Sequence, residues 1–528
     1  MKIDGWLFIA VVVALVLISE AGASSIYQDQ TSSEKNETVL SYRPALNGAE
    51  LQAVLSDFEK YAEKSIKDWQ VPGMAIAIVR GNDIIYMHSF GVRDVNGTDP
   101  VTNNTIFNIA SITKSFTTAL VAMQVDEGKV NWDDKVIDHL PDFRMYDPWV
   151  TREFTVTDLA AMRSDLPNSN PAENLGATGY NRSYIMHAIR YIKPDKSFRS
   201  GFNYQNNLLL WEAALVESKT GKSWEDNVRD RIFLPLNMTN SSTDVKSFQQ
   251  AKDVASKHVI MENGTVKALP MNSKYMEDPY GPAGSINSNI IDMAKFLRLQ
   301  MNNGTFEGKR LINKSSMIYM HSPKTVIPSG AIAKEFPAYY CQGWIYSEYR
   351  PYPIVLNAGM DYHRSIIAFM PDAKLGIVVL CNAYPTALPN ALAWRFFDMY
   401  FGNPNKDWST QDLNKWKEIQ KRSSASRPKP PEHPSPALPL EEYAGNYSNE
   451  IYGQINLTAK ENNLIATTGP IGMQIVLTPW NRDTFSAIIQ DIITAPPGFA
   501  SFHIGPDGTA DSVTLDLRYF DNATFKRV

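Results

Sequence analysis

Apolar residues recur along the chain in two different periods, and the change of period divides it into regions. From Leu51 to Lys67 apolar side chains return every three to four residues, which predicts an amphipathic helix. The dense apolar runs 73–79 and 84–90 flank the turn-forming residues 80–83 and predict a β-hairpin. We therefore expect a helix and a strand pair to open the folded part of the chain.

Helical periodicity continues through the middle of the chain and then gives way to strands. Thr155 and Asp158 form the pattern of a capping box. Helices are predicted over residues 111–127, 206–220, 224–233 and 290–301. Strand-like runs follow over 343–349, 354–357, 365–370 and 375–381, and a helix over 391–401. Consecutive strands enclosed by helices predict an α+β domain with an antiparallel sheet flanked by helices.

The last quarter of the chain has a different character. Residues 403–440 begin with a charged helix at about 410–422 and continue with six prolines between Pro428 and Pro439. Prolines at this density favour an extended, semi-rigid spacer. Residues 441–528 alternate apolar and polar positions between Gly and Asn turns, which predicts a small all-β domain.

The N-terminus has the pattern of a secretory signal. Lys2 precedes thirteen apolar residues (6–18), and Ala21-Gly22-Ala23 matches a cleavage site, so we expect residues 1–23 to be removed. An uncleaved anchor is the alternative, although a membrane span needs about 20 apolar residues. A polar lead segment, 24–44, follows the signal. After cleavage we expect no membrane contact.

Acceptor sequences for N-glycosylation are numerous and agree with export. They occur at Asn36, Asn96, Asn103, Asn181, Asn237, Asn240, Asn263, Asn303, Asn313, Asn446, Asn456 and Asn522. Together with the signal they predict a secreted, extracellular glycoprotein.

Composition and charge exclude several classes of function. A hydrophobic fraction of 44% with a net charge of −5 is typical of a folded protein rather than a disordered one. No run of Lys and Arg with interleaved aromatic residues occurs, so nucleic acid is not an expected partner. The eight His residues form no zinc-type cluster, and no phosphate-binding or dinucleotide-binding loop is present, so we expect neither a metal nor a cofactor.

The chain has two cysteines, Cys341 and Cys381, on or beside predicted strands of one sheet. Two buried thiols are one interpretation. A single disulfide, formed in an oxidising compartment, is the other.

Candidate chemistry centres on Ser111-Ile-Thr-Lys114, an S-x-x-K pattern that opens a predicted helix. Ser and Lys three residues apart lie on one helix face, so the amine reaches the hydroxyl. A helix N-terminus adds free backbone N–H groups, and desolvation lowers the pKa of a lysine until it accepts the serine proton. The simpler interpretation is a capping serine followed by a solvated lysine. The pattern also occurs at Ser32 and Ser426, outside any amphipathic helix.

The surroundings of Ser111 resemble the serine β-lactamase and penicillin-binding-protein-like family, in its class C-like, peptidase S12 branch. The resemblance is carried by segments 107–117, 127–134, 154–159, 202–206, 221–224, 231–236 and 281–284. It implies a β-lactamase/transpeptidase-like hydrolase domain over 45–402. The segment Glu441-Glu-Tyr-Ala-Gly-Asn-Tyr resembles the lipocalin-like β-domain that often follows it, which implies such a domain over 441–528.

The resemblance also implies roles for individual residues. Ser111 would be the acylated nucleophile and Lys114 its proton partner. Tyr204 and Asn206 match the Y-x-N motif, in which the phenol passes a proton to the leaving group and the amide orients substrate and Lys114. The oxyanion hole would use the backbone N–H of Ser111 and one near Met360.

The third motif of the family is altered. Where the family has a cation followed by a glycine, this chain has Asn357-Ala358-Gly359, and an Asn side chain is neutral. Arg364 or the neighbouring His363 is then a candidate for the missing charge. We predict Asn357, Gly359 and Arg364 as substrate-binding residues.

Two functions of different class remain. The first is a secreted serine hydrolase that acts through an acyl-enzyme on an amide or ester, with a D-amino-acid peptidase-like or esterase-like small-molecule or peptide substrate. The second is an extracellular-matrix component, for example of a mineralised matrix, that reuses the fold with little or no catalysis and binds other matrix components. The altered third motif favours the second, and the intact Ser111, Lys114, Tyr204 and Asn206 favour the first.

Overall fold

The computed structural model describes most of the chain from residue 46 onward. The described residues are 46–168, 170–270, 279–328, 336–349, 352–403, 405–425, 428–429, 431–490, 492 and 495–528. The predicted signal 1–23, the lead segment 24–44 and the sequon at Asn36 lie outside them.

An eight-stranded antiparallel sheet forms the centre of the first domain, in the order β2-β1-β14-β13-β12-β11-β10-β9. Its strands are β1 (Gly73–Arg80), β2 (Asp83–Gly91), β9 (Thr325–Ile327), β10 (Ala338–Tyr340), β11 (Ile345–Ser347), β12 (Ile354–Met360), β13 (Arg364–Met370) and β14 (Leu375–Cys381). Every residue of β13 and β14 is buried, because helices cover both faces of the sheet. This explains why these strands have continuous apolar runs rather than alternation.

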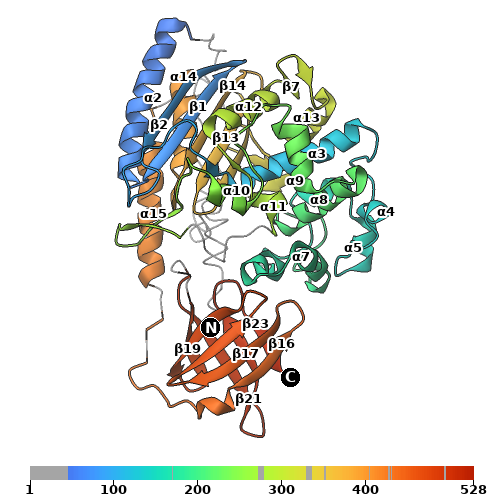
Figure 1. Ribbon diagram of the computed structural model, residues 1–528, viewed down its shortest axis with the longest axis vertical. Coiled ribbons are helices and arrows are strands. Elements are labelled where there is room, and N and C mark those ends of the chain that lie inside the picture. The colour runs from blue at the N-terminus through green and yellow to red at the C-terminus, as the bar shows by residue number, and fades with distance from the viewer. Residues whose placement is uncertain are drawn as a thin grey trace, which may run out of the picture.

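Helices from the two ends of the domain pack on one face of the sheet, and helices from its middle pack on the other (Figure 1). The first layer contains α2 (Gly48–Asp68), α14 (Leu388–Phe401) and α15 (Trp408–Ala425). The second contains α3 (Thr113–Asp126), α12 (Ile290–Met301) and α13 (Lys314–His321). The predicted α+β architecture is therefore confirmed.

Most of the remaining helices form a lobe beside α3 (Figure 1). They are α4 (Val136–His139), α5 (Pro148–Glu153), α6 (Val156–Ala160), α7 (Arg182–Ala188), α8 (Asn207–Thr220), α9 (Trp224–Val228) and α11 (Gly281–Gly284). Helix α10 (Val245–Gln250) lies outside this lobe, in front of the sheet. Thr155 forms the predicted capping box with Asp158 at the start of α6. Helix α9 is shorter than predicted, because the chain continues as a π-helix over Arg229–Phe233. Short strands connect these parts: β3 (Phe107–Asn108), β4 (His258–Ile260), β5 (Val266–Ala268), β6 (Asn287–Ser288), β7 (Thr305–Phe306), β8 (Lys309–Arg310) and β15 (Ala383–Tyr384).

The predicted strand 343–349 is wrong at its start. Gly343 has φ +68°, in the left-handed region, and β11 begins only at Ile345. A Cβ at position 343 would lie 2.9 Å from the carbonyl oxygen of Lys114, so the backbone of this turn approaches α3 more closely than a side chain allows. The turn thereby contributes a carbonyl to the site described below.

The C-terminal domain is a closed eight-stranded antiparallel barrel, as the all-β prediction requires. Its strands are β16 (Gly445–Asn449), β17 (Gly453–Lys460), β18 (Asn463–Thr468), β19 (Met473–Asn481), β20 (Thr484–Ile489), β21 (Gly498–Ile504), β22 (Ala510–Asp516) and β23 (Ala523–Arg527). Buried and exposed residues alternate along most of them, because one face of each strand fills the barrel interior.

The barrel packs against the helical lobe near α7 (Figure 1). Tyr180 OH donates a hydrogen bond to the Tyr452 carbonyl (2.9 Å), and Tyr184 OH donates to the Ile451 carbonyl (3.1 Å). The backbone of Gly469 touches the Thr178 carbonyl, where a Cβ would come within 2.2 Å. The hairpin turns of the barrel therefore contact the first domain directly.

Cys341 and Cys381 are both buried and both free. Cys341 follows β10 and Cys381 ends β14, and three strands separate these two in the sheet. Strands lie about 4.8 Å apart, so the separation is roughly 19 Å, far beyond disulfide reach. Of the two interpretations, buried thiols describe the structure.

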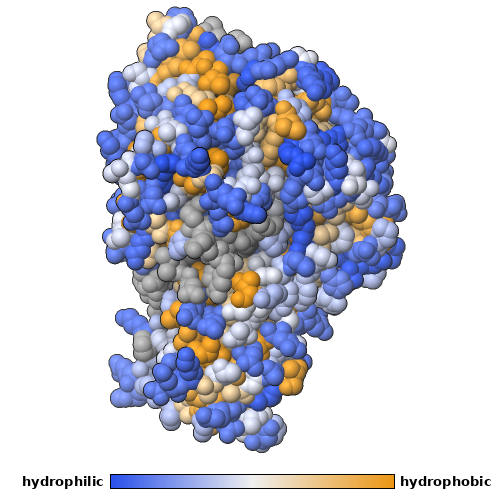
Figure 2. Space-filling model, viewed as in Figure 1, coloured by the Kyte–Doolittle hydropathy of each residue, from blue (hydrophilic) through white to orange (hydrophobic). Residues whose placement is uncertain are grey.

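The surface seen in Figure 2 is mostly hydrophilic, with apolar residues in small separate patches. None of the described helices is both long and apolar enough to cross a membrane.

Candidate active site

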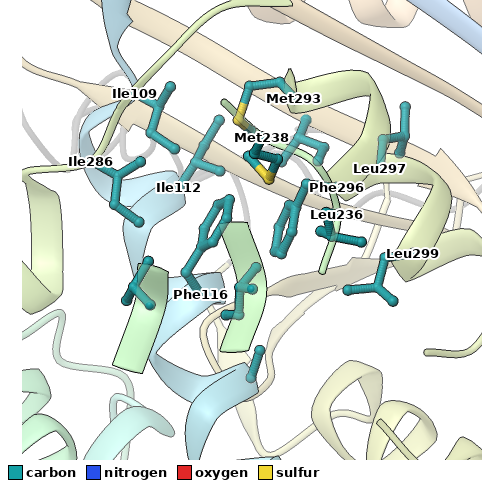
Figure 3. Packing of buried hydrophobic residues seen from close by; sticks show 14 of the residues in the cluster. Ile109, Ile112, Phe116, Leu236, Met238, Ile286, Met293, Phe296, Leu297 and Leu299 are labelled. Atoms are coloured by element: carbon teal, nitrogen blue, oxygen red, sulfur yellow. The ribbon is translucent and has the colours of Figure 1, made fainter. Parts of the chain in front are cut away.

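The segment that carries Ser111 is fixed by core residues on either side of it. Ile109, Ile112 and Phe116 are fully buried, and the Phe116 ring stacks on Phe296 at 3.7 Å between centroids (Figure 3). Ser111 lies between these anchors in a single 3₁₀ turn, Ala110–Ile112, and is partly exposed. Burial of its neighbours therefore directs the serine away from the core.

The backbone before Ser111 is strained. Ala110 has φ +47°, a left-handed conformation that costs a non-glycine residue about 1 kcal/mol or more. Asn108 holds it, because its Oδ1 accepts the Ala110 N–H (3.1 Å) while its Nδ2 donates to the Asn287 side chain (3.1 Å). The strain places Ser111 on a sharp turn before α3.

Lys114 and Tyr204 both reach the Ser111 hydroxyl. Lys114 Nζ donates to Ser111 Oγ (2.9 Å) and to the Ala283 carbonyl (2.9 Å). Tyr204 OH also donates to Ser111 Oγ, at 2.9 Å, and the ammonium lies 4.9 Å from the Tyr204 ring centroid. The structure thus brings three of the four predicted catalytic residues together at one oxygen.

Burial prepares Lys114 for proton transfer. Its side chain has no exposed surface, and desolvation lowers its pKa from 10.5 to about 7, against the opposing charge of Glu173. Desolvation also raises the pKa of Tyr204, so the phenol keeps its proton at neutral pH. The pair offers a proton acceptor and a proton donor to the same hydroxyl.

Asn206, the fourth predicted residue, is bound to a glutamate that sequence reasoning missed. Asn206 Nδ2 donates to Glu173 Oε2 (2.6 Å), whereas the hydrogen bonds of Lys114 go to Ser111 and Ala283. Glu173 lies in a 3₁₀ turn, Pro171–Asn174, within a polar loop. The sequence around Glu173 contains no motif that indicates a function. Its one recognisable feature, Asn170-Pro171, predicts a helical turn.

Asn357 lies against the backbone of Ser111 and is 5% exposed. Its Nδ2 donates to the Ser111 carbonyl (3.1 Å), to Ser115 Oγ (2.9 Å) and to the Gly343 carbonyl (2.8 Å). The amide therefore joins β12, α3 and the Gly343 turn where the family pattern has a cation.

Gly359 is required by a close backbone approach. A Cβ there would lie 2.1 Å from the Ile109 carbonyl. Strand β11 pairs with β12 only from Ile354 to Leu356, so on that edge none of the described strands pairs with β12 from Asn357 to Met360. This free edge begins beside Ser111, whose carbonyl accepts the Asn357 amide.

Arg364 lies apart from this group. Its neighbour Ser365 donates to the Ile109 carbonyl (2.9 Å), on the Ser111 side of the sheet, and successive side chains of a strand alternate. Arg364 is thus directed to the opposite face, where it is 5% exposed beside Cys381 and Tyr384. Burial lowers its pKa to about 10, so it stays charged, and its Nε has no hydrogen-bond partner in the described structure.

His363 supplies no positive charge at neutral pH. Its Nδ1 accepts the Asn108 N–H (2.8 Å), its Nε2 lies 3.2 Å from the Ser256 carbonyl, and burial lowers its pKa to about 3. Among the described residues no cluster of three or more His, Cys, Asp or Glu side chains is arranged to hold a metal ion.

Comparison with known proteins agrees with this geometry. A sequence model of the beta-lactamase family matches residues 58–396, and one described as "Domain of unknown function (DUF3471)" matches residues 429–527. Among characterised proteins, the chain is 27% identical to the unguisins hydrolase ungD' of Aspergillus campestris (strain IBT 28561), over 87% of this chain and 89% of that protein.

Two further similarities cover different shares of the chain. Protein flp of Staphylococcus aureus (strain NCTC 8325 / PS 47) is 25% identical over 62% of this chain and 63% of its own length. The octameric penicillin-binding protein homologue from Pyrococcus abyssi has a similar fold, with a TM-score of 0.56 at 21% identity over 89% of this chain and 99% of that one.

Proposed function

Because this chain belongs to the beta-lactamase family of serine hydrolases, we propose that it cleaves an amide or ester through a covalent acyl-enzyme on Ser111. One observation carries the proposal: Ser111 Oγ lies 2.9 Å from both Lys114 Nζ and Tyr204 OH. The buried amine can accept the proton of the hydroxyl as the oxygen attacks. The phenol can donate a proton to the leaving group.

The reaction divides into two steps. The neutral amine of Lys114 takes the Ser111 proton as Oγ attacks the carbonyl carbon, and the C=O π electrons move to the oxygen. As the tetrahedral intermediate collapses, the bond to the leaving group breaks and Tyr204 protonates the leaving amine or alcohol, itself recovering a proton from Lys114. Water then attacks the acyl carbon in the same way and releases the acid. The N–H groups of Ser111 and Met360 would bind the oxyanion.

The proposal defines the substrate by the bond that is cleaved, an amide or an ester, and names no single compound. Similarity to an unguisins hydrolase and to penicillin-binding protein homologues favours peptidase-like substrates, with D-amino-acid and simple ester substrates as the classes to test. The free edge of β12 at Asn357 and Gly359 would pair with an extended substrate backbone.

We assign Arg364 no part in substrate binding, because its side chain is directed to the face of the sheet opposite Ser111, beside Cys381 and Tyr384. In Arg364→Gln, KM should stay unchanged both for a substrate with a carboxylate beyond the scissile bond and for its neutral amide. A rise in KM for the carboxylate substrate alone would place Arg364 in the binding site.

Active-site labelling tests the function. Wild type should take up a fluorophosphonate or a penicillin label, and Ser111→Ala, matched in folding by circular dichroism, should not. A panel of esters, D-aminoacyl amides and β-lactams then identifies the class that is turned over. Folded wild type that neither labels nor shows a Ser111-dependent rate would overturn the hydrolase and favour the matrix component.

Secretion and glycosylation are part of the proposal. Each of the sequon asparagines in the described residues, from Asn96 to Asn522, is exposed or partly exposed, which an N-glycan requires. Expression in a eukaryotic secretory host should deliver the chain to the medium with residues 1–23 removed, and endoglycosidase treatment should lower its mass. Retention in the cell without a mass change would contradict this part.

A further inference from the structure

Glu173 makes a concentrated set of contacts at the start of α8. Its Oε1 accepts the N–H groups of Asn206 (2.7 Å) and Asn207 (2.9 Å), and its Oε2 accepts the side-chain amide of Asn206 (2.6 Å). No side chain of α8 itself caps its N-terminus, because Asn206 occupies the cap position without a capping bond. A carboxylate from a distant loop thus satisfies the first orphan donors of the helix.

These contacts determine the geometry of the Y-x-N motif. Asn206 is held by both its backbone and its amide, and Gln205 is held in the same loop by the Asn170 amide, which donates to its Oε1 (2.7 Å). Tyr204, one residue earlier, donates to Ser111 Oγ. A displacement of the loop at Asn206 therefore moves the phenol relative to the nucleophile.

The carboxylate of Glu173 also acts on the proton acceptor. Among the described residues, two titratable groups face Lys114: Tyr204, whose ring lies 4.9 Å from Nζ, and Glu173, whose negative charge raises the pKa of Lys114 against desolvation. Lys114 in turn lowers the pKa of Glu173, which burial raises. Removing this carboxylate changes both the shape of the loop and the charge beside the amine.

The barrel holds the segment that carries Glu173. The adjacent Asn174 side chain lies close to Tyr452 and Asp521 of the barrel. The Ile471 N–H approaches the Thr178 carbonyl at 3.4 Å, and the hydroxyl groups of Tyr180 and Tyr184 donate to barrel carbonyls as described above. Residues 170–184 are therefore enclosed between the catalytic residues and the turns of the C-terminal domain.

We propose that Glu173 is a positioning residue for the reaction at Ser111, which orients Asn206 and Tyr204 and is kept in place by the barrel. The inference rests on the proposed function, since it concerns the same nucleophile. It assigns a task to the C-terminal domain: its turns support the wall of the site opposite β12.

Labelling kinetics with a fluorophosphonate across pH test the proposal. Glu173→Gln keeps the size of the side chain and loses its charge, so the rate at Ser111 should fall roughly 10- to 100-fold, as for other misplaced catalytic groups. Its pH dependence should also move to lower pH, because the charge that favours protonated Lys114 is gone. Glu173→Asp keeps the charge and should restore the pH dependence even if the rate stays reduced. A residue that only caps α8 would leave the pH dependence unmoved.

Glu212→Gln is the matched control. Glu212 is a fully buried glutamate on α8 with no hydrogen-bond partner in the described structure, and burial raises its pKa well above the ordinary value. Because burial favours the neutral form of this carboxyl, the isosteric Gln variant should label like wild type. Wild-type rate and pH dependence in Glu173→Gln would overturn the inference and leave the hydrolase standing. Absence of labelling in wild type would overturn both.

The barrel contact has its own pair of variants. Tyr180→Phe with Tyr184→Phe removes the two hydroxyl donors to the barrel, and labelling should slow about 3- to 10-fold. Tyr443→Phe is the control, because the Tyr443 hydroxyl bonds to Asp483 and to Leu438 N–H, away from the interface. Equal rates in the double variant and the control would show that the barrel does not support the site. If Glu173→Gln does not fold, this pair still decides whether the supported segment matters.

Discussion

The two walls of the site differ in charge. On one wall, Lys114 and Glu173 are ionisable groups whose pKa values are shifted by burial and by each other. On the other wall, β12 presents Asn357 and Gly359, which are neutral, and the Asn357 amide is committed to the Ser111 carbonyl and to the Gly343 turn. We infer that the wall with Lys114 and Glu173 serves proton transfer, whereas the β12 wall determines the shape of the site.

This difference separates the two parts of catalysis. Proton transfer needs groups with tuned pKa values close to the nucleophile, and these are present. Electrostatic recognition of a substrate beside the scissile bond needs a cation, and β12 has none at the position where the family has one. We expect variants of the first wall to lower kcat and variants of the second to affect folding or KM.

The largest effect is expected from Lys114→Met. Loss of the proton acceptor should lower kcat/KM roughly 10³- to 10⁴-fold. The same change should stabilise the fold by on the order of 2 kcal/mol at pH 7, because a buried lysine with a lowered pKa is costly. Activity measurements and chemical denaturation of the two proteins check both halves. A destabilised Met variant would contradict the account of burial.

The pH dependence of wild type follows from the same group. The pKa of Lys114 is about 7 in the fold and ordinarily 10.5, so activity should rise as the pH rises through about 7 and the amine loses its proton. Because the unfolded chain binds this proton more tightly, the Lys114 contribution to stability should also increase from about pH 7 towards 10.5. Rate profiles with wild type, and unfolding free energies of wild type against Lys114→Met, measure the two trends. A flat rate profile between pH 6 and 8 would remove Lys114 as the base.

Tyr204→Phe should have the next largest effect. The variant keeps the ring and loses the proton donor, so hydrolysis of an amide should slow roughly 100-fold. An ester with a good leaving group needs little protonation and should slow by about 10-fold at most. The ratio of the two rates is the measurement, and equal losses on both substrates would place Tyr204 in orientation rather than proton transfer.

Much of the proton-transfer wall follows from local spacing in the sequence. Ser111 and Lys114 are three residues apart at a helix start, and Tyr204 belongs to a short motif, so each is visible without the fold. The strands of the sheet and of the barrel can also be predicted from local sequence, because runs of apolar or alternating residues define them. The start of β11 cannot be predicted in this way, because the close approach of Gly343 to α3 involves segments distant in the chain.

Tertiary contacts account for what the sequence does not show. Glu173 lies in a polar loop without a period and meets Asn206 only after folding. The sequence shows that Asn357 is neutral, but not that its amide faces the carbonyl of the nucleophile. The distance between Cys341 and Cys381 likewise depends on strand order, which neighbouring residues do not encode.

The smallest effect on chemistry is expected from Asn357→Asp. The change replaces an N–H donor by an oxygen that faces the Ser111 and Gly343 carbonyls, so the free energy of unfolding should fall by about 2 kcal/mol while KM stays within about threefold. Asn82→Asp is the matched control, because the exposed Asn82 Oδ1 accepts the Asn302 side-chain amide and an aspartate accepts it equally well. If Asn357 bound substrate directly, KM would rise without a loss of stability, and the β12 wall would be a recognition surface like its counterpart in the family. A loss of stability at constant KM instead leaves recognition to the backbone edge of β12, where a neutral substrate needs no cation.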